Sequence, residues 1–197
     1  MSTRWQHANV ARGADYDARW QELADSGQNI HGEADLVEGL LREGSGRRVL
    51  DAGCGTGRIA IELDRRGFTV SGIDVDPEMI AEARSKAPSL TWLLGDLTEQ
   101  RPDAAAEPVD LVLLAGNVMI FLEPGTEQWV LANLAGTLTP SGLLVAGFSV
   151  RPDGLTPARY DEIAAAAGLE QVTRWATWDR DPYTGGDYVV SVHRRPR

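Results

Sequence analysis

Short apolar runs alternate with segments of helical pattern along most of this chain. The runs are rich in Leu, Val and Ile and show little of the every-second-residue polarity of a half-exposed strand, which is typical of parallel strands covered by helices on both faces. We therefore predict five parallel strands, at 47–53, 68–74, 90–96, 109–116 and 142–150. Helical patterns between them predict crossover helices at 58–66, 77–87 and 126–137.

The C-terminal part of the chain has a different pattern. A helix is predicted at 157–168, where Gly168 suits the left-handed residue that ends a helix. Two strand-like runs follow, at 169–179 and 187–195, and the linker 180–186 is too short for another crossover. We expect an antiparallel hairpin here, and we expect Pro140 and Gly142 to break the chain before the fifth strand.

The first 46 residues precede the first strand and have helical patterns at 16–24 and 33–42. In open α/β sheets, ligands bind in the crevice at the carboxyl ends of the strands. We therefore expect residues 1–46 to form a helical cap at that edge, within the same domain as residues 47–197.

Composition limits the classes of partner and compartment. A chain of 197 residues with 43% hydrophobic content is enough for one core. Its formal net charge of −10 argues against nucleic acid as a partner, because that binding depends on clustered Lys and Arg. The single cysteine, Cys54, excludes an intrachain disulfide and a structural zinc site of several thiolates. Without an apolar run of roughly 18 residues or the apolar region of a signal peptide, we expect no membrane partner and a cytoplasmic protein.

The chemistry of the chain concentrates in VLDAGCGTG, residues 49–57. Glycines at 53, 55 and 57 follow a predicted strand and precede a predicted helix, so the backbone can turn tightly and approach a ligand closely. The spacing departs from the dinucleotide fingerprint G-x-G-x-x-G, because Arg58 occupies the position of its third glycine. Asp51 at the strand end disfavours a pyrophosphate and favours a cationic ligand; its alternative role is to cap the glycine loop.

Two further acids lie at the ends of the next two predicted strands. Asp74, in GIDVDPEM, can accept hydrogen bonds from both hydroxyls of a ribose. Asp96, in LLGDL, can accept from an exocyclic amino group or cap a turn instead. Asp76, before Pro77, is predicted to cap the next helix. A cationic group, a ribose and an amino-bearing base without phosphate together describe S-adenosylmethionine.

These three motifs resemble those of the class I, Rossmann-like S-adenosylmethionine-dependent methyltransferases, from about Arg47 to the C-terminus. The resemblance implies a three-layer α/β sandwich whose seven-stranded, mostly parallel sheet has the order 3-2-1-4-5-7-6 with strand 7 antiparallel. It also implies S-adenosylmethionine as the cofactor, with S-adenosylhomocysteine as the product.

The resemblance further implies a set of cofactor-binding residues. Asp51, Gly53 and Gly55 would line the methionine part, Asp74 would hold the ribose, and the backbone near Ala115 and Gly116 would meet the methionyl amino group. The adenine would contact Val75, Met79, Asp96 and Leu97, while YDARW (16–20) resembles the cap of small members. The full set is Tyr16, Trp20, Asp51, Gly53, Cys54, Gly55, Arg58, Asp74, Val75, Met79, Gly95, Asp96, Leu97, Ala115 and Gly116.

The acceptor side is less defined. His31 is a candidate general base, with a loop residue as its alternative, and Asn117 is expected to face the acceptor. Methyl transfer from a sulfonium depends mainly on positioning, so we expect no metal. AGNVMIFL, after the fourth strand, lacks the asparagine-proline-proline-aromatic segment of nucleic-acid methylases. Candidate walls of the acceptor pocket are Tyr16, Trp20, Met119, Phe121 and Tyr183.

The sequence thus predicts an enzyme that methylates a small molecule, with oxygen slightly favoured over nitrogen, sulfur or carbon as the acceptor atom. Two alternatives remain open: a protein that binds S-adenosylmethionine or S-adenosylhomocysteine without catalysis, and an NAD(P)-dependent oxidoreductase. We expect a monomer or a homodimer.

Overall fold

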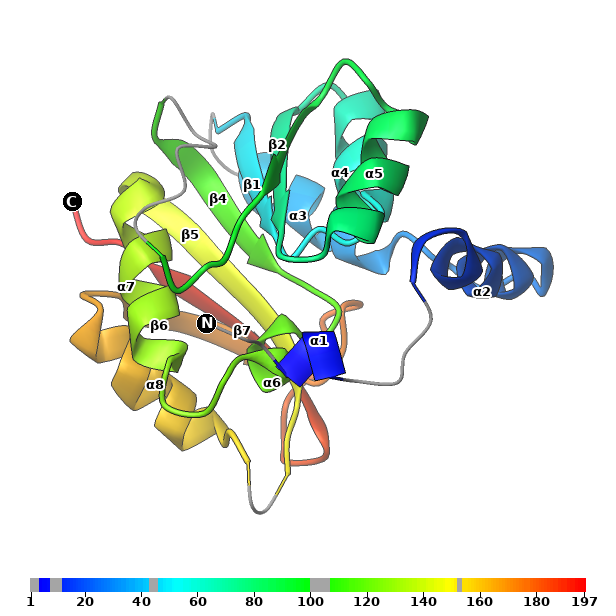
Figure 1. Cartoon of the computed structure of the whole chain (residues 1–197). Coiled ribbons are helices and arrows are strands. Elements are labelled where there is room, and N and C mark those ends of the chain that lie inside the picture. The colour runs from blue at the N-terminus through cyan, green and yellow to red at the C-terminus, as the bar shows by residue number, and fades with distance from the viewer. Residues whose placement is uncertain (1–3, 8–11, 43–45, 100–106, 152–153) are drawn as a thin grey trace.

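The computed structural model has one seven-stranded sheet with helices on both faces (Figure 1). The structure describes residues 4–7, 12–42, 46–99, 107–151 and 154–197. The strand order is β3-β2-β1-β4-β5-β7-β6, with β7 antiparallel to both of its neighbours. The predicted fold class, strand order and terminal hairpin are therefore confirmed.

The elements follow the predicted alternation. The strands are β1 (Arg48–Ala52), β2 (Thr69–Asp74), β3 (Thr91–Leu94), β4 (Val109–Leu114), β5 (Leu138–Ser149), β6 (Glu170–Trp175) and β7 (Tyr188–Arg194). The helices are α1 (Arg4–His7), α2 (Gly13–Asp25), α3 (Gly32–Arg42), α4 (Arg58–Arg65), α5 (Pro77–Lys86), α6 (Val118–Phe121), α7 (Glu127–Thr137) and α8 (Pro157–Ala166). No helix among these described residues is both long and apolar enough to cross a membrane.

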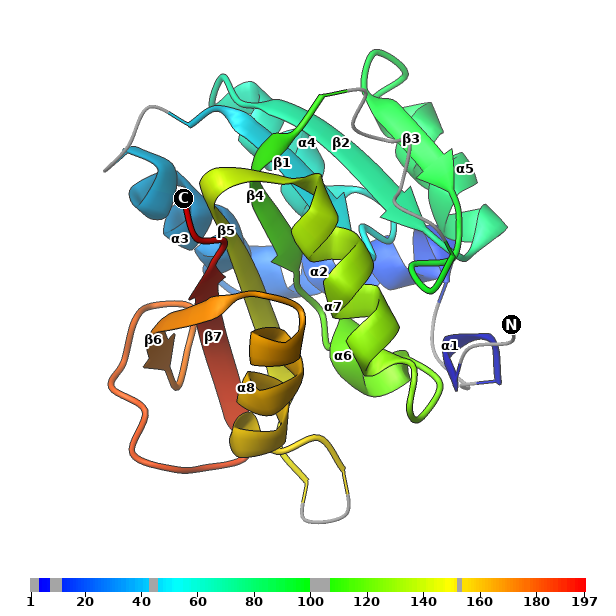
Figure 2. The same ribbon diagram turned by 90° about the vertical axis from the view of Figure 1, so that its left-hand side faces the viewer.

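Two apolar clusters sandwich the sheet, because successive strand residues face opposite sides. Val49 of β1 belongs to the cluster that includes residues of α3, α4 and α5, whereas Leu50 belongs to the cluster that includes residues of α6, α7 and α8. Figure 2 shows α7 and α8 over one face of the sheet and α3 and α4 behind the other. Burial on both faces explains why the inner strands have continuous apolar runs.

Two boundaries differ clearly from the sequence-based expectation, the start of β5 and the end of β6. β5 begins at Leu138 and runs through Pro140 and Gly142, which lie at an irregularity in its pairing with β4 instead of ending the strand. β6 ends at Trp175, so the predicted extension to 179 is wrong. Trp178 leaves the strand, packs its indole against Gly147 and donates its N–H to the Tyr188 hydroxyl at 3.1 Å.

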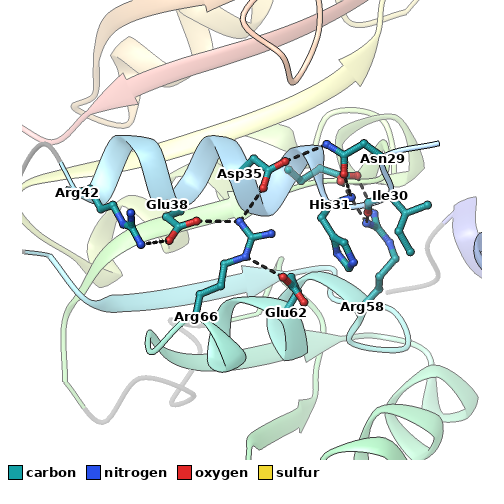
Figure 3. Close-up of polar contacts among 10 residues, drawn as sticks. Asn29, Ile30, His31, Asp35, Glu38, Arg42, Arg58, Glu62 and Arg66 are labelled. Atoms are coloured by element: carbon teal, nitrogen blue, oxygen red, sulfur yellow. Dashed lines mark hydrogen bonds and ion pairs between the residues drawn. The ribbon is translucent and has the colours of Figure 1, made fainter. Parts of the chain in front are cut away.

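A charged network joins α3 to α4, which cover the same face of the sheet (Figure 3). The Arg66 guanidinium donates to Asp35 and Glu38 of α3, at 2.7 and 2.9 Å, and to Glu62 of α4 at 2.8 Å. These partners raise the pKa of Arg66, whereas the hydrogen bond from Asn29 is the largest influence that lowers the pKa of Asp35. The network holds α3 against α4, and both helices begin at the carboxyl ends of the strands.

Candidate functional site

The glycine loop connects β1 to α4 and lies at the carboxyl edge of the sheet. Gly53, Gly55 and Gly57 all have positive φ, at 83°, 54° and 81°, a region that residues with a Cβ rarely occupy. The Gly53 N–H donates to the Ile73 carbonyl at 2.8 Å, which ties the loop to β2. The positive φ angles therefore explain why glycine occupies these three positions, as predicted. Without side chains there, the loop backbone is open to close approach by a ligand.

The Trp92 ring also leaves no space for a side chain at Gly57. A Cβ at this position would lie 2.5 Å from the Trp92 ring, which is buried and donates its N–H to the Ala87 carbonyl at 2.8 Å. We predict that Gly57→Ala lowers the free energy of unfolding by about 2–5 kcal/mol through backbone strain and overpacking, as measured by urea denaturation. Gly67→Ala is the matched control, because Gly67 has φ 86° and open space around it. The control should lower the free energy of unfolding by about 1–2 kcal/mol. Equal decreases in the two variants would show that the Trp92 ring moves aside without a measurable cost.

Asp51, at the end of β1, is the most deeply buried acid of the site. Its side chain is 1% exposed, and Oδ2 has no hydrogen-bond partner among the described residues. Burial raises the pKa of Asp51 to about 7, and the charge of Asp74 adds to this, while Arg58 and the Ala60 backbone N–H lower it. A buried carboxylate oxygen without a partner is costly. Asp51 is therefore set up to receive a cationic or hydrogen-donating group of a ligand.

Asp74 ends β2 and organises two backbone segments. Oδ2 accepts from the Gly55 N–H at 2.8 Å and Oδ1 accepts from the Asp76 N–H at 2.9 Å. Burial raises the pKa of Asp74, and these backbone hydrogen bonds oppose that rise. Because each carboxylate oxygen has two lone pairs, both can still accept from a ligand. Asp76 accepts from the Glu78 N–H at 2.9 Å, as the predicted N-cap of α5.

Asp96 follows β3. Its Oδ1 accepts from both the backbone N–H and the hydroxyl of Thr98, at 2.9 and 2.8 Å. The turn-capping role considered as an alternative is therefore present. Asp96 also lines the pocket described next, and its contact with an amino group of a ligand stays a prediction.

A pocket lies at this edge of the sheet, with about 890 Å³ of empty space that includes its opening to solvent. The structure brings together every predicted cofactor-binding residue there except Trp20; that they bind the cofactor stays a prediction. The lining residues are Trp5, Tyr16, Asp51, Gly53, Cys54, Gly55, Thr56, Arg58, Ile59, Asp74, Val75, Met79, Gly95, Asp96, Leu97, Ala115, Gly116, Val118, Phe121 and Leu122.

The N-terminal helices attach to both sides of the pocket. Trp5 of α1 donates its indole N–H to Asp76 at 2.9 Å and meets Phe121 of α6 edge-on, with ring centroids 5.1 Å apart. Asp17 of α2 accepts from the Thr56 hydroxyl at 2.5 Å and pairs with Lys86 of α5. Figure 1 shows α1 beside α6 and α2 extending away past α5.

Arg58 begins α4 and forms one wall of the pocket. Its guanidinium pairs with Glu33 of α3 at 2.7 Å and donates to the Ile30 carbonyl, as Figure 3 shows in part. It also stacks 3.8 Å from the centre of the Trp20 ring. Trp20 thus lies behind Arg58, which explains why this predicted residue does not line the pocket.

The two predicted catalytic residues lie outside the pocket lining. His31 stands just before α3, with its backbone N–H bonded to Asn29, and its ring lies between Asp35 and Arg58 in Figure 3. Asn117 has φ 67°, and its amide oxygen accepts from the Ser149 N–H at 2.7 Å, which links α6 to β5. Asn117 therefore positions the chain after β4, and a catalytic role for either residue stays a prediction.

Several lining residues were absent from the predicted cofactor set: Trp5, Thr56, Ile59, Val118, Phe121 and Leu122. Thr56 lies inside the glycine motif, so its position in that motif was an available signal. Phe121 was expected only as an acceptor wall. Trp5 had no signal, because nothing in the sequence around it fixes where α1 docks.

Comparisons with known proteins agree with this geometry. The model of a methyltransferase domain family matches residues 49–142. A crystal structure of a TehB-like SAM-dependent methyltransferase from Corynebacterium glutamicum is 35% identical, covers 92% of this chain and 97% of that chain, and superposes with a TM-score of 0.83.

Curated relatives include two enzymes with different acceptor atoms. Glycine N-methyltransferase of Rattus norvegicus is 33% identical over 122 residues, 54% of this chain and 42% of the relative. Magnesium-protoporphyrin O-methyltransferase of Rhodobacter capsulatus is 33% identical over 113 residues, 55% of this chain and 46% of the relative. The chain thus spans less than half the length of these curated relatives.

The fold, the glycine loop with its three acids, and the extent of the match to the Corynebacterium structure lead to one family. The cofactor predicted from the sequence, S-adenosylmethionine, is the one that defines this family. The chain belongs to the class I, Rossmann-like S-adenosylmethionine-dependent methyltransferases.

Proposed function

We propose that this chain transfers the methyl group of S-adenosylmethionine to a small-molecule acceptor. The observation that carries the proposal is Asp51: a fully buried carboxylate with an unpartnered oxygen lines the pocket. A cationic ligand relieves the cost of that burial, whereas the pyrophosphate of a dinucleotide would increase it. The residues present therefore fit S-adenosylmethionine.

The pocket residues divide among the parts of the cofactor. Asp51 and the bare backbone of Gly53 suit the charged methionine end, and Asp74 suits the ribose hydroxyls. The apolar side chains of Val75, Met79 and Leu97 suit the adenine, together with Asp96 for its amino group. When bound, S-adenosylmethionine supplies an activated methyl group, so the chain has to hold an acceptor in line with it.

The N-terminal segment is part of the proposal as a cap. Trp5 contacts Asp76 on one side of the pocket and Phe121 on the other, and Asp17 fastens α2 to the glycine loop through Thr56. Such contacts support closure over a bound cofactor and exclusion of water from it. In this proposal residues 1–46 serve the same domain as residues 47–197.

The acceptor atom is open among oxygen, nitrogen, sulfur and carbon. Oxygen remains the preference from the sequence. The curated relatives named above include both an N- and an O-methyltransferase. Among the described residues, the pocket lining contains no histidine. Methylation of an acceptor that does not have to lose a proton would therefore need no further residue as a general base.

Turnover distinguishes an enzyme from a protein that only binds the cofactor. S-adenosylmethionine with a labelled methyl group is incubated with panels of alcohols, sugars, amines and thiols. We expect one class of acceptor to become labelled and S-adenosylhomocysteine to form in equal amount. Tight binding of S-adenosylmethionine with no labelled acceptor in any panel would favour the non-catalytic alternative.

A further inference from the structure

A second pocket lies next to the first, with about 1130 Å³ of empty space that includes its opening to solvent. The two share a wall: Trp20 and Glu33 line the second pocket, and both contact Arg58, which lines the first. The second pocket is built from α2, the start of α3, the loop between β6 and β7, and the first residue of β7. Its lining is Trp20, Asn29, Gly32, Glu33, Ala176, Thr177, Trp178, Asp179, Gly185, Gly186, Asp187 and Tyr188.

All charged side chains that line the second pocket are acidic. Three carboxylates line the second pocket, and no Lys or Arg does. Glu33 already has Arg58 as its partner. Asp179 and Asp187 form no ion pair within the part of the chain that the structure describes, and both are exposed. The pocket thus presents two carboxylates whose charge is available to a ligand.

Two aromatic side chains, Trp178 and Tyr188, line the same pocket and contact each other. The Trp178 indole N–H donates to the Tyr188 hydroxyl, and both rings occupy space that a side chain at Gly147 would fill. Burial raises the pKa of Tyr188 to about 12, with the charge of Glu33 as a further cause, so the phenol is neutral and Glu33 lies close to it. A pocket lined by carboxylates together with Trp and Tyr rings favours an organic cation.

A metal ion is a poorer fit to the same residues. No group of three or more His, Cys, Asp or Glu side chains within the described ranges has an arrangement that could hold a metal. The aromatic rings of the pocket also supply no ligand atoms for a bare ion. The cation that suits this pocket is therefore an organic one.

We propose that the second pocket binds the protonated amino group of a small organic amine, through Asp179 and Asp187 and the rings of Trp178 and Tyr188, behind the wall that Arg58 forms in the first pocket. A role of this amine as methyl acceptor rests on the proposed function and would use another nucleophilic atom of the molecule, because an ammonium nitrogen has no lone pair; its binding does not rest on that function. The net charge of −10 also favours the approach of a cation.

The test uses three probes that share a phenol ring: tyramine, which ends in an ammonium group, tyrosol, which ends in a hydroxyl, and 4-hydroxyphenylacetate, which ends in a carboxylate. Each is titrated calorimetrically into the full chain, with and without saturating S-adenosylhomocysteine. We expect tyramine to bind saturably and at least tenfold more tightly than tyrosol, with the carboxylate weakest. In nitrogen-15 NMR spectra, tyramine should shift the indole signal of Trp178.

The variant Asp179→Asn/Asp187→Asn should weaken tyramine binding at least fivefold and leave S-adenosylhomocysteine affinity unchanged. Glu170→Gln is the control, since it removes an exposed charge at the start of β6, outside both pocket linings. Equal affinity for tyrosol, unchanged tyramine binding by the double variant, or no saturable tyramine binding would overturn the inference. Absence of S-adenosylhomocysteine binding to the parent protein would instead count against the proposed function.

Discussion

Replacing Asp74 with alanine is expected to weaken S-adenosylhomocysteine binding at least tenfold, or about 1.4 kcal/mol. The variant removes the acceptor that we propose for the ribose hydroxyls. It also leaves the Gly55 and Asp76 N–H groups without their present partner, which loosens the loop that borders the ligand. Isothermal titration calorimetry at constant pH measures the change.

Asp110→Ala is the matched control for this prediction. Asp110 also accepts two backbone N–H hydrogen bonds, from Arg47 and Arg48 at 2.7 and 2.9 Å, but it lies at the opposite edge of the sheet. Its loss should destabilise the fold to a similar degree without changing ligand affinity. An Asp74→Ala protein that binds as tightly as the parent would reject the ribose assignment.

The second large effect is a dependence of ligand affinity on pH, carried by Asp51. Burial raises its pKa to about 7, above the value of about 3.9 for a solvated aspartate. A positively charged ligand group favours the ionised form, so binding becomes tighter as pH rises through 7. We expect roughly five- to tenfold higher affinity at pH 7.5 than at pH 6, with a weaker and flatter profile in Asp51→Asn.

The stability of the ligand-free protein should change in the opposite direction. Between the solvated and the raised pKa of Asp51, the folded protein binds more protons than the unfolded chain. The free energy of unfolding therefore falls as pH rises from about 4 to 7, and the raised pKa of Asp74 adds to this trend. Urea denaturation across this range should show a shallower fall for Asp51→Asn; identical slopes would contradict the burial argument.

The sequence predicted the glycine loop and its acids because their chemistry is local. Gly53, Gly55 and Gly57 adopt conformations that only their residue type explains, and Asp51 and Asp74 end strands whose apolar runs are unambiguous. Parallel strands bring such ends to one edge whatever the details of packing. This part of the site follows from residue type and position alone.

Other parts depend on how distant segments pack. Nothing near Trp5 in the sequence indicates that its indole reaches Asp76 and Phe121. The prediction for Trp20 identified the right segment, but Arg58 stands between its ring and the pocket. The end of β6 was misplaced because Trp178 is strand-like in pattern, yet it packs against Gly147, which no local rule foresees.

Calorimetric titration of the full chain with S-adenosylhomocysteine and, in parallel, with NADH shows whether the pocket around Asp51 takes a phosphate-free nucleoside with a cationic group. We expect saturable one-to-one binding of S-adenosylhomocysteine and no saturable binding of NADH. Saturable binding of NADH with none of S-adenosylhomocysteine would rule out this assignment of the pocket.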